Sequence, residues 1–149
     1  MATLNAALAR LSGFATTVLR IVVGGLMAYH GFDKFRGGVD GVEAFFTMVD
    51  VPVPVLTAPV VATLELVGGL ALVAGIGTRV VASALAAILA GAMVFVKIDV
   101  GIIATSGSMP GVELDLALLA GLAALTLLGP GQLALDRMLG LDGARVATG

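Results

Sequence analysis

The chain has 149 residues, of which 59% are hydrophobic and only 12% charged, and its mean hydropathy is +1.12. Soluble domains carry about 25% charged residues, so this composition excludes an ordinary soluble globule. A net charge of −2 makes nucleic acid an improbable partner, and the absence of cysteine excludes disulfides, thiol exchange and iron–sulfur clusters held by the chain's own thiolates.

Four apolar segments lie along the chain, at about residues 12–29, 57–75, 80–96 and 112–128. At about 1.5 Å per residue, each segment is near the minimum length for a helix that crosses a bilayer. Backbone groups in hydrocarbon must find their hydrogen bonds within the segment, so helices are the expected structure. The sequence therefore predicts an all-α membrane protein, a four-transmembrane-helix bundle in which residues 1–149 form a single domain.

The connections between these segments differ in length. A short turn, Gly75-Ile76-Gly77, joins the second and third segments and predicts an antiparallel hairpin. The longer connection after the first segment contains Asp40 and Glu43, spaced as a capping box, and apolar residues follow them at helical spacing. We expect a short helix at about residues 40–49 that lies in the membrane interface.

Small residues recur four positions apart in the apolar segments, a spacing that lets helices approach closely in lipid. The pairs are Gly24 and Ala28, Ala71 and Gly75, Ala87 and Gly91, and Ala117 and Gly121. They favour close packing and association with a protein partner or a second copy of the chain. A composition rich in alanine and glycine would give the same pattern without close packing.

Two opposite charges lie deep in apolar segments, Arg20 in the first and Glu65 in the second. An unpaired charge at the centre of a bilayer costs about 2.5 to 3.5 kcal/mol on insertion scales. We therefore expect a buried Arg20–Glu65 ion pair near the midplane. Two interpretations stay open: the pair only fixes helix packing, or it lines a polar cavity for a ligand or a proton.

A polar and aromatic group is expected at the other ends of the segments, on one side of the membrane. It comprises Tyr29, His30, Lys34, Lys97, Asp99, Glu113 and Asp115, together with Phe32, Phe35, Phe45, Phe46 and Phe95. One interpretation is an aromatic belt with solvated charges. The other is a mouth that binds a quinone-like lipid, with Tyr29, His30, Lys34 and Glu113 as candidate ligand-binding residues. His30 is the only histidine, and its ordinary pKa of about 6.5 suits proton exchange.

The residue types in this sequence exclude most kinds of metal, cofactor and catalytic site. One histidine and no cysteine exclude the usual zinc, haem-pair and copper ligand sets, so we expect no metal site and no covalently bound cofactor. No nucleophile–base pair can be assigned, which leaves open whether the chain is an enzyme. Any redox role then depends on a bound cofactor, such as a quinone, or on a partner protein.

Basic residues suggest an orientation. Arg10, Arg79, Arg137 and Arg145 fall on one side of the predicted bundle, and Lys34, Arg36 and Lys97 fall on the other. The positive-inside rule favours a multi-pass protein of a bacterial inner membrane with both termini in the cytoplasm.

Several short motifs, taken in order, resemble those of the DoxX family of small four-helix membrane proteins. They are Arg20, the run Tyr29-His30-Gly31-Phe32-Asp33-Lys34-Phe35, Val51-Pro52-Val53-Pro54, Glu65-Leu66-Val67-Gly68-Gly69, Gly75-Ile76-Gly77-Thr78-Arg79, Glu113 and Gly129-Pro130-Gly131-Gln132-Leu133-Ala134-Leu135-Asp136. The resemblance extends from about Arg20 to Asp136. Ala134 stands where the family usually has serine.

The resemblance implies a redox connection. Family relatives include a subunit of a thiosulfate:quinone oxidoreductase, and others are linked to membrane complexes that handle oxidative stress and thiol balance. It points to Arg20, His30, Lys34, Glu65, Arg79 and Glu113 as positions of interest.

Three functions follow as hypotheses. The leading one is a membrane subunit of a redox-linked complex that binds a quinone-like lipid or anchors a soluble oxidoreductase. The second is a non-catalytic structural or assembly subunit of a larger membrane complex. The third, which the slim bundle disfavours, is a transporter of a small molecule or proton that uses Glu65.

Overall fold

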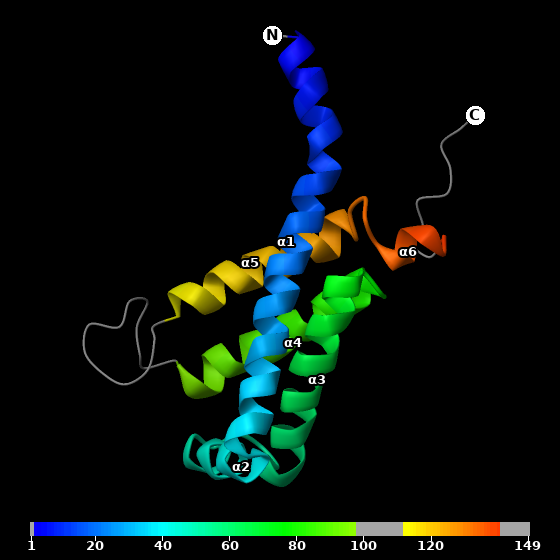
Figure 1. The fold of residues 1–149 in the computed structure, drawn as a ribbon. Helices are drawn as coiled ribbons and strands as arrows, with labels where there is room; N and C mark the ends of the chain where they lie inside the picture. The colour runs from blue at the N-terminus through cyan, green and yellow to red at the C-terminus, as the bar shows by residue number, and fades with distance from the viewer. Residues whose placement is uncertain (1, 98–111, 141–149) are drawn as a thin grey trace.

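The computed structural model describes residues 2–97 and 112–140, and all helices named here lie in these ranges (Figure 1). In chain order they are α1 (Ala2–Gly37), α2 (Val39–Met48), α3 (Pro54–Ala74), α4 (Thr78–Val96), α5 (Glu113–Leu128) and α6 (Leu135–Met138). The described ranges contain no strand, so the predicted all-helical fold is confirmed.

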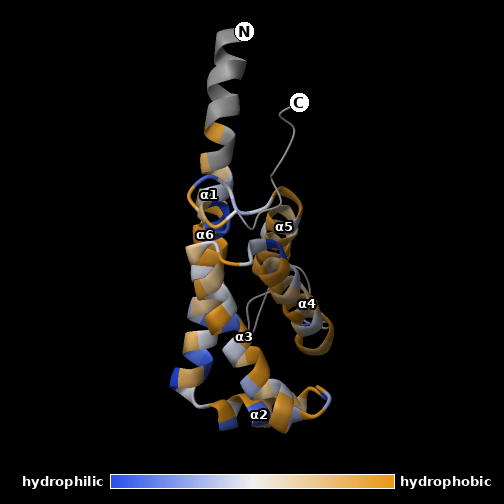
Figure 2. Ribbon diagram, turned by 90° about the vertical axis from the view of Figure 1, so that its right-hand side faces the viewer, coloured by the Kyte–Doolittle hydropathy of each residue, from blue (hydrophilic) through white to orange (hydrophobic). Residues whose placement is uncertain are grey.

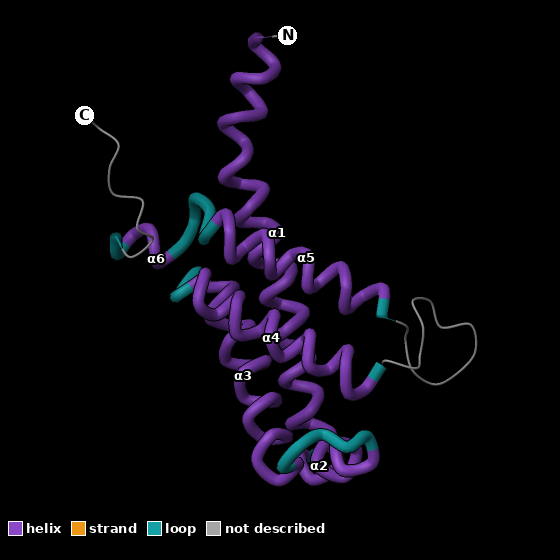
Figure 3. The backbone as a smooth tube through the Cα atoms, turned by 180° about the vertical axis from the view of Figure 1, so that it is seen from behind, coloured by secondary structure: helices purple, strands orange, loops and turns teal. Residues whose placement is uncertain are grey.

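The long helices form two antiparallel pairs. Helices α1 and α3 make the most extensive contact, and α4 packs on α5. The second pair runs obliquely across the first, and α2 lies across the end of the first pair (Figures 1 and 3). A core of buried apolar residues joins the two pairs, including Val23, Met27, Leu72, Leu85 and Leu122.

The first helix is longer than the sequence predicted. It was expected to end near Tyr29, where the apolar run ends, but α1 continues to Gly37. No proline or left-handed glycine interrupts it, and the chain turns only at Gly38, whose φ is 92°. His30 and Lys34 therefore lie inside α1, where their spacing of four residues places them on one helical face.

The start of α2 also differs from the prediction. Gly38, not Asp40, is the residue that precedes the helix, and no side chain caps it. Asp40 lies in the first turn, where its negative charge still complements the helix dipole. The predicted capping box is thus absent, although the helix occupies the predicted segment.

Helices α3 and α4 are long and apolar enough to cross a membrane, judged by length and composition. Helix α5 is shorter, at 16 residues. The outer surface carries large apolar side chains, among them Val67, Val80 and Leu127, each more than half exposed. Hydrophobic residues make up most of α4 and α5 (Figure 2). Charged side chains such as Arg20 and Glu65 are buried instead. Apolar residues outside and charges inside are the arrangement expected of helices that face hydrocarbon.

Glycines bring α1 and α3 into backbone contact. A Cβ added to Gly69 would lie 2.6 Å from the carbonyl oxygen of Gly24, and one added to Gly31 would lie 2.7 Å from that of Ala62. Real side chains do not fit at such separations, so these glycines fix both the spacing and the register of the two helices. Of the small-residue pairs, Gly24 and Ala28 do pack closely, against Gly69.

The C-terminal segment (residues 129–140) holds the turn between α3 and α4 in place through hydrogen bonds. Gly75 (φ 75°) and Gly77 (φ 58°) have left-handed backbones, which glycine adopts without a Cβ penalty. The Asp136 carboxylate accepts hydrogen bonds from the backbone N–H groups of Gly77 (2.6 Å) and Thr78 (2.8 Å), which are otherwise unpaired at the start of α4. Its own backbone N–H donates to the Gly75 carbonyl at 2.8 Å.

These contacts affect the ionisation of Asp136. Burial raises the pKa of its carboxyl, but the hydrogen bonds from Thr78 and Gly77 and the nearby Arg20 guanidinium lower it by more. The pKa of Asp136 therefore lies below its ordinary value, and its carboxylate form stabilises the fold.

A Gly69→Ala substitution should destabilise the protein, because its Cβ would collide with the α1 backbone. We expect a loss of about 1 to 3 kcal/mol, measured by thermal or denaturant unfolding in detergent. Gly25→Ala is the matched control, since a Cβ at Gly25 meets nothing within 4 Å. Equal stability of the two variants would contradict the close α1–α3 contact.

An Asp136→Asn substitution should lower stability at neutral pH by about 1 kcal/mol, because the amide NH2 group would face an N–H donor. The lowered pKa sets the pH dependence. The carboxylate contribution is complete above the unfolded pKa of about 3.9 and is lost as pH falls through the folded pKa. The gap between wild type and variant should therefore close in acid, and a gap independent of pH would rule out this role.

Candidate functional site

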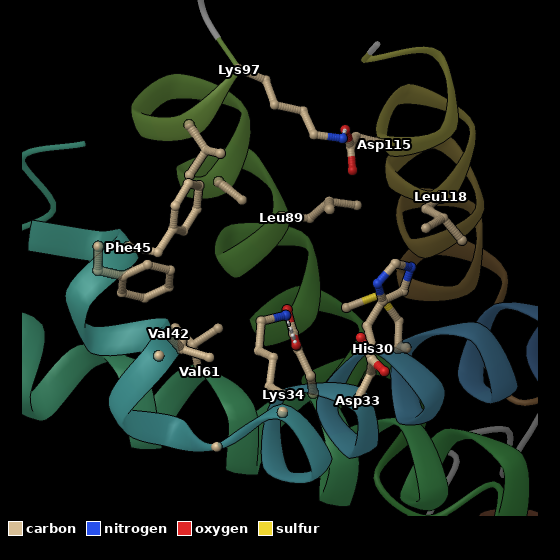
Figure 4. Close-up of a pocket in the computed structure, with 18 residues that line it drawn as sticks. His30, Asp33, Lys34, Val42, Phe45, Val61, Leu89, Lys97, Asp115 and Leu118 are labelled. Carbon is tan, nitrogen blue, oxygen red and sulfur yellow. Dashed lines mark hydrogen bonds and ion pairs between the residues drawn. The ribbon is translucent and has the colours of Figure 1, made fainter. Parts of the chain in front are cut away.

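A cavity of about 460 Å3 lies between the C-terminal half of α1, α2, α3 and the facing ends of α4 and α5 (Figure 4). Small-molecule sites typically enclose about 300 to 1,000 Å3, so this volume suits a ring-sized ligand. The charged and ionisable residues of its lining are His30, Asp33, Lys34, Glu65, Lys97 and Asp115. Its apolar lining includes Met27, Val42, Phe45, Phe46, Val61, Leu89 and Leu118.

The first ion pair in this cavity joins Lys34 of α1 to Glu65 of α3. The Glu65 side chain is 9% exposed and the Lys34 side chain 24%, so the carboxylate is the more deeply buried partner. The predicted ion pair between Arg20 and Glu65 is therefore wrong. Glu65 has its compensating cation in the last turns of α1.

The register of α1 on α3 explains the error. The prediction placed Arg20 and Glu65 at one depth because it aligned helices that began near residues 12 and 57. The glycine contacts instead set Gly31 against Leu66, so that Lys34, about one turn further on, reaches Glu65.

Arg20 lies at the opposite end of the α1–α3 pair. Its Nη2 group donates to the carbonyl oxygen of Leu133, and its Nη1 group packs on Gly75, where a Cβ would collide with it. The Asp136 carboxylate is close enough to act on its charge. Arg20 is 1% exposed, and its hydrogen bond to Leu133 joins the segment after α5 to α1.

The second ion pair in the cavity joins Lys97 at the end of α4 to Asp115 in the first turn of α5. Both side chains are mostly buried, 17% and 13% exposed respectively. Figure 4 shows Lys97 and Lys34 entering the cavity from opposite sides, with Leu89 between them. The sequence placed Lys97 and Asp115 on one side of the bundle, and they do meet there.

The other predicted ligand-binding residues divide into two groups. His30 lines the cavity, and Figure 4 shows its ring rising from α1 toward Leu118 of α5. Tyr29 is 62% exposed and is not part of the cavity lining, and Glu113 is likewise exposed outside it. Asp99 lies outside the described residues.

One cavity residue was missed from the sequence. Asp33 follows His30 by three positions, a spacing that places both on one face of a helix. This signal was available once α1 was known to continue past Tyr29, because helical spacing then extends to Asp33 and Lys34.

The cavity combines hydrogen-bond donors, carboxylates and an aromatic wall. The Lys34 and Lys97 ammonium groups and the His30 ring can donate to carbonyl oxygens of a ligand, and the paired carboxylates can accept protons. Phe45 and Phe46, whose ring centroids lie 6.4 Å apart, can contact a flat ring. Hydrogen bonds gain strength in such a low-dielectric setting, so the arrangement suits a planar ligand with polar oxygens.

A double-mutant cycle should identify the partner of Glu65. We expect Lys34→Met and Glu65→Met to be coupled by about 0.5 to 3 kcal/mol in unfolding free energy, because each single change leaves a largely buried charge unpaired. The cycle of Arg20→Met with Glu65→Met is the control, and its two effects should add. Coupling in the Arg20 cycle and additivity in the Lys34 cycle would reverse the assignment.

Comparison with known proteins shows the family of the chain. The sequence model of the DoxX family matches residues 15–98 of the chain. A protein of Bacillus subtilis (strain 168) named "Putative oxidoreductase CatD" is 35% identical over 121 residues, which cover 81% of this chain and 84% of that protein. No solved structure matches. The matched region contains α3 and α4, which are long and apolar enough to cross a membrane, and most of the cavity residues. This chain belongs to the DoxX family.

Proposed function

We propose that this protein is the integral membrane subunit of a redox-linked complex and that it binds a quinone-like lipid in the cavity between the two helix pairs. The observation that carries the proposal is the pair of lysine–carboxylate ion pairs, Lys34–Glu65 and Lys97–Asp115, lining one cavity with His30 and an aromatic wall. The relationship to a family member named as an oxidoreductase supports the redox connection.

The donors suit the two carbonyl oxygens of a quinone ring. Lys34 and Lys97 project from opposite sides of the cavity, so one ammonium group can serve each oxygen (Figure 4). Reduction of the ring adds two electrons and two protons. His30 and the lysines can deliver protons to the ring oxygens, while Glu65 and Asp115 hold the lysines in position.

The electrons come from a partner in this proposal. The sequence contains no cysteine, so thiol oxidation cannot take place on this chain. A soluble oxidoreductase bound at the membrane surface would supply the electrons, and the protein would serve as both its anchor and its site of quinone exchange.

The proposed membrane arrangement uses four spanning helices. Helices α3 and α4 cross the bilayer as a hairpin, and α1 and α5 complete the bundle with their apolar outer faces. Helix α2, which carries the exposed Met48 and the buried Phe46, lies in the interface beneath the cavity. Both termini lie on the cytoplasmic side of a bacterial inner membrane, following the distribution of basic residues.

An assembly subunit without a redox ligand is the alternative. The N-terminal turns of α1 extend beyond the other helices, which offers a partner a helix to pack on (Figure 1). Here the ion pairs of the cavity would only hold the bundle together. Purification of a stoichiometric complex whose activity is indifferent to the cavity substitutions would favour this alternative.

Quinone titration of the purified protein tests the leading proposal. A decyl-tailed benzoquinone should bind the wild type in nanodiscs and quench an added fluorescent reporter. His30→Ala and Lys97→Met should each weaken its binding by about tenfold, the loss of one good hydrogen bond. Tyr29→Phe is the matched control, because Tyr29 neighbours His30 but lies outside the cavity lining.

Two results would count against the proposal. One is the absence of quinone binding by well-folded wild type. The other is binding that responds equally to Tyr29→Phe and to the cavity substitutions, which would indicate association with the outer surface.

A further inference from the structure

A second cavity, of about 260 Å3, adjoins the first (about 460 Å3). It lies between the start of α3, the segment before it and the C-terminal half of α4. Its lining consists of Phe46, Val51, Pro52, Thr57, Val61, Ala87, Ile88, Gly91, Ala92, Phe95 and Val96. The charged residues of the first cavity are absent from this lining.

Thr57 is the one side chain of this lining with a hydrogen-bonding group. Its hydroxyl is already engaged with the carbonyl oxygens of Pro52 (3.2 Å) and Val53 (3.1 Å). The carbonyl oxygens of a head group would therefore find no free side-chain donor here and would lose their hydration on entry. The chemistry of this cavity suits a hydrocarbon chain.

The two cavities share a wall. Phe46, Val61, Ala92 and Val96 line both of them. We call the first cavity the polar cavity and the second the apolar cavity. Because the two adjoin along these residues, a single molecule can occupy both, with its ring beside Lys34 and its chain beside Gly91.

Gly91 keeps the apolar cavity open. A Cβ added to Gly91 meets nothing within 4 Å, so this glycine does not serve a close contact between helices. The small-residue pair of Ala87 and Gly91, interpreted from the sequence as a helix-packing face, lines this cavity instead. The absence of side-chain bulk at position 91 leaves space for a ligand.

We propose that the apolar cavity holds the hydrocarbon tail of the molecule whose ring occupies the polar cavity, so that the site selects tailed quinones over the free ring. This inference rests on the proposed function. It adds that Gly91 determines the preference for the tail.

A Gly91→Leu variant tests the inference, because its side chain would fill the apolar cavity without a backbone clash. The probes are a decyl-tailed benzoquinone and the same benzoquinone without a tail, titrated in nanodiscs of one composition. Gly91→Leu should weaken binding of the tailed quinone by about tenfold and leave the tail-less quinone unchanged. Comparing variants in one lipid composition cancels the partitioning of the tail into the bilayer.

Gly25→Leu is the control, since a Cβ at Gly25 also meets nothing within 4 Å and Gly25 lines neither cavity. It should leave binding of both quinones unchanged. An unchanged affinity of Gly91→Leu for the tailed quinone would overturn the inference, as would an equal loss for both quinones. Failure of either quinone to bind the wild type would instead overturn the proposed function beneath it.

A second measurement does not depend on the folding of a variant. A quinone with a diazirine at the end of its tail should label wild-type α4 around Ile88, Gly91 and Phe95 on irradiation. Labelling of lipid alone, or of the outer faces of α1 and α5, would show that the tail lies outside this cavity.

Discussion

The backbone contact between α1 and α3 sets the rest of the structure. Gly31 and Gly69 allow the two helices to approach so closely that only one register fits. In that register Lys34 meets Glu65, and Arg20 meets the turn that begins at Gly75. The buried Glu65 carboxylate thereby lies against a cation, and the buried Arg20 guanidinium lies against the carbonyl oxygen of Leu133 and near Asp136, which offsets part of the cost of burying these charges.

The charged residues divide the bundle into two ends with different roles. At one end, Arg20 and Asp136 tie the C-terminal segment to the α3–α4 turn and hold the two helix pairs together. At the other end, the pairs enclose the polar cavity, and Lys34 and Lys97 point into it from facing elements. The bundle is thus held together by polar contacts at one end and encloses a cavity at the other.

The sequence predicted the helices better than their pairing. Hydrophobic segments and glycine turns located α3 and α4 closely, because both signals are local. The end of α1 was missed, because loss of hydropathy at Tyr29 does not end a helix that has no breaker before Gly38.

The Arg20–Glu65 pair was wrong for a related reason. The prediction took the depth of Arg20 and Glu65 in the bilayer from the expected ends of their helices. The register of α1 on α3 is instead determined by the glycine contacts. The sequence grouped four ionisable residues of the polar cavity, His30, Lys34, Lys97 and Asp115, on one side of the bundle. Tyr29 and Glu113 lie outside this cavity because of the direction of their side chains, which residue spacing alone did not provide.

Thiol crosslinking measures the register of α1 on α3 directly. The sequence contains no cysteine, so that only the introduced cysteines can react. With a short bifunctional thiol reagent, the double variant Lys34→Cys with Glu65→Cys should crosslink efficiently in membranes, and Arg20→Cys with Glu65→Cys should not. Efficient crosslinking of the Arg20 variant, with none for the Lys34 variant, would contradict the account.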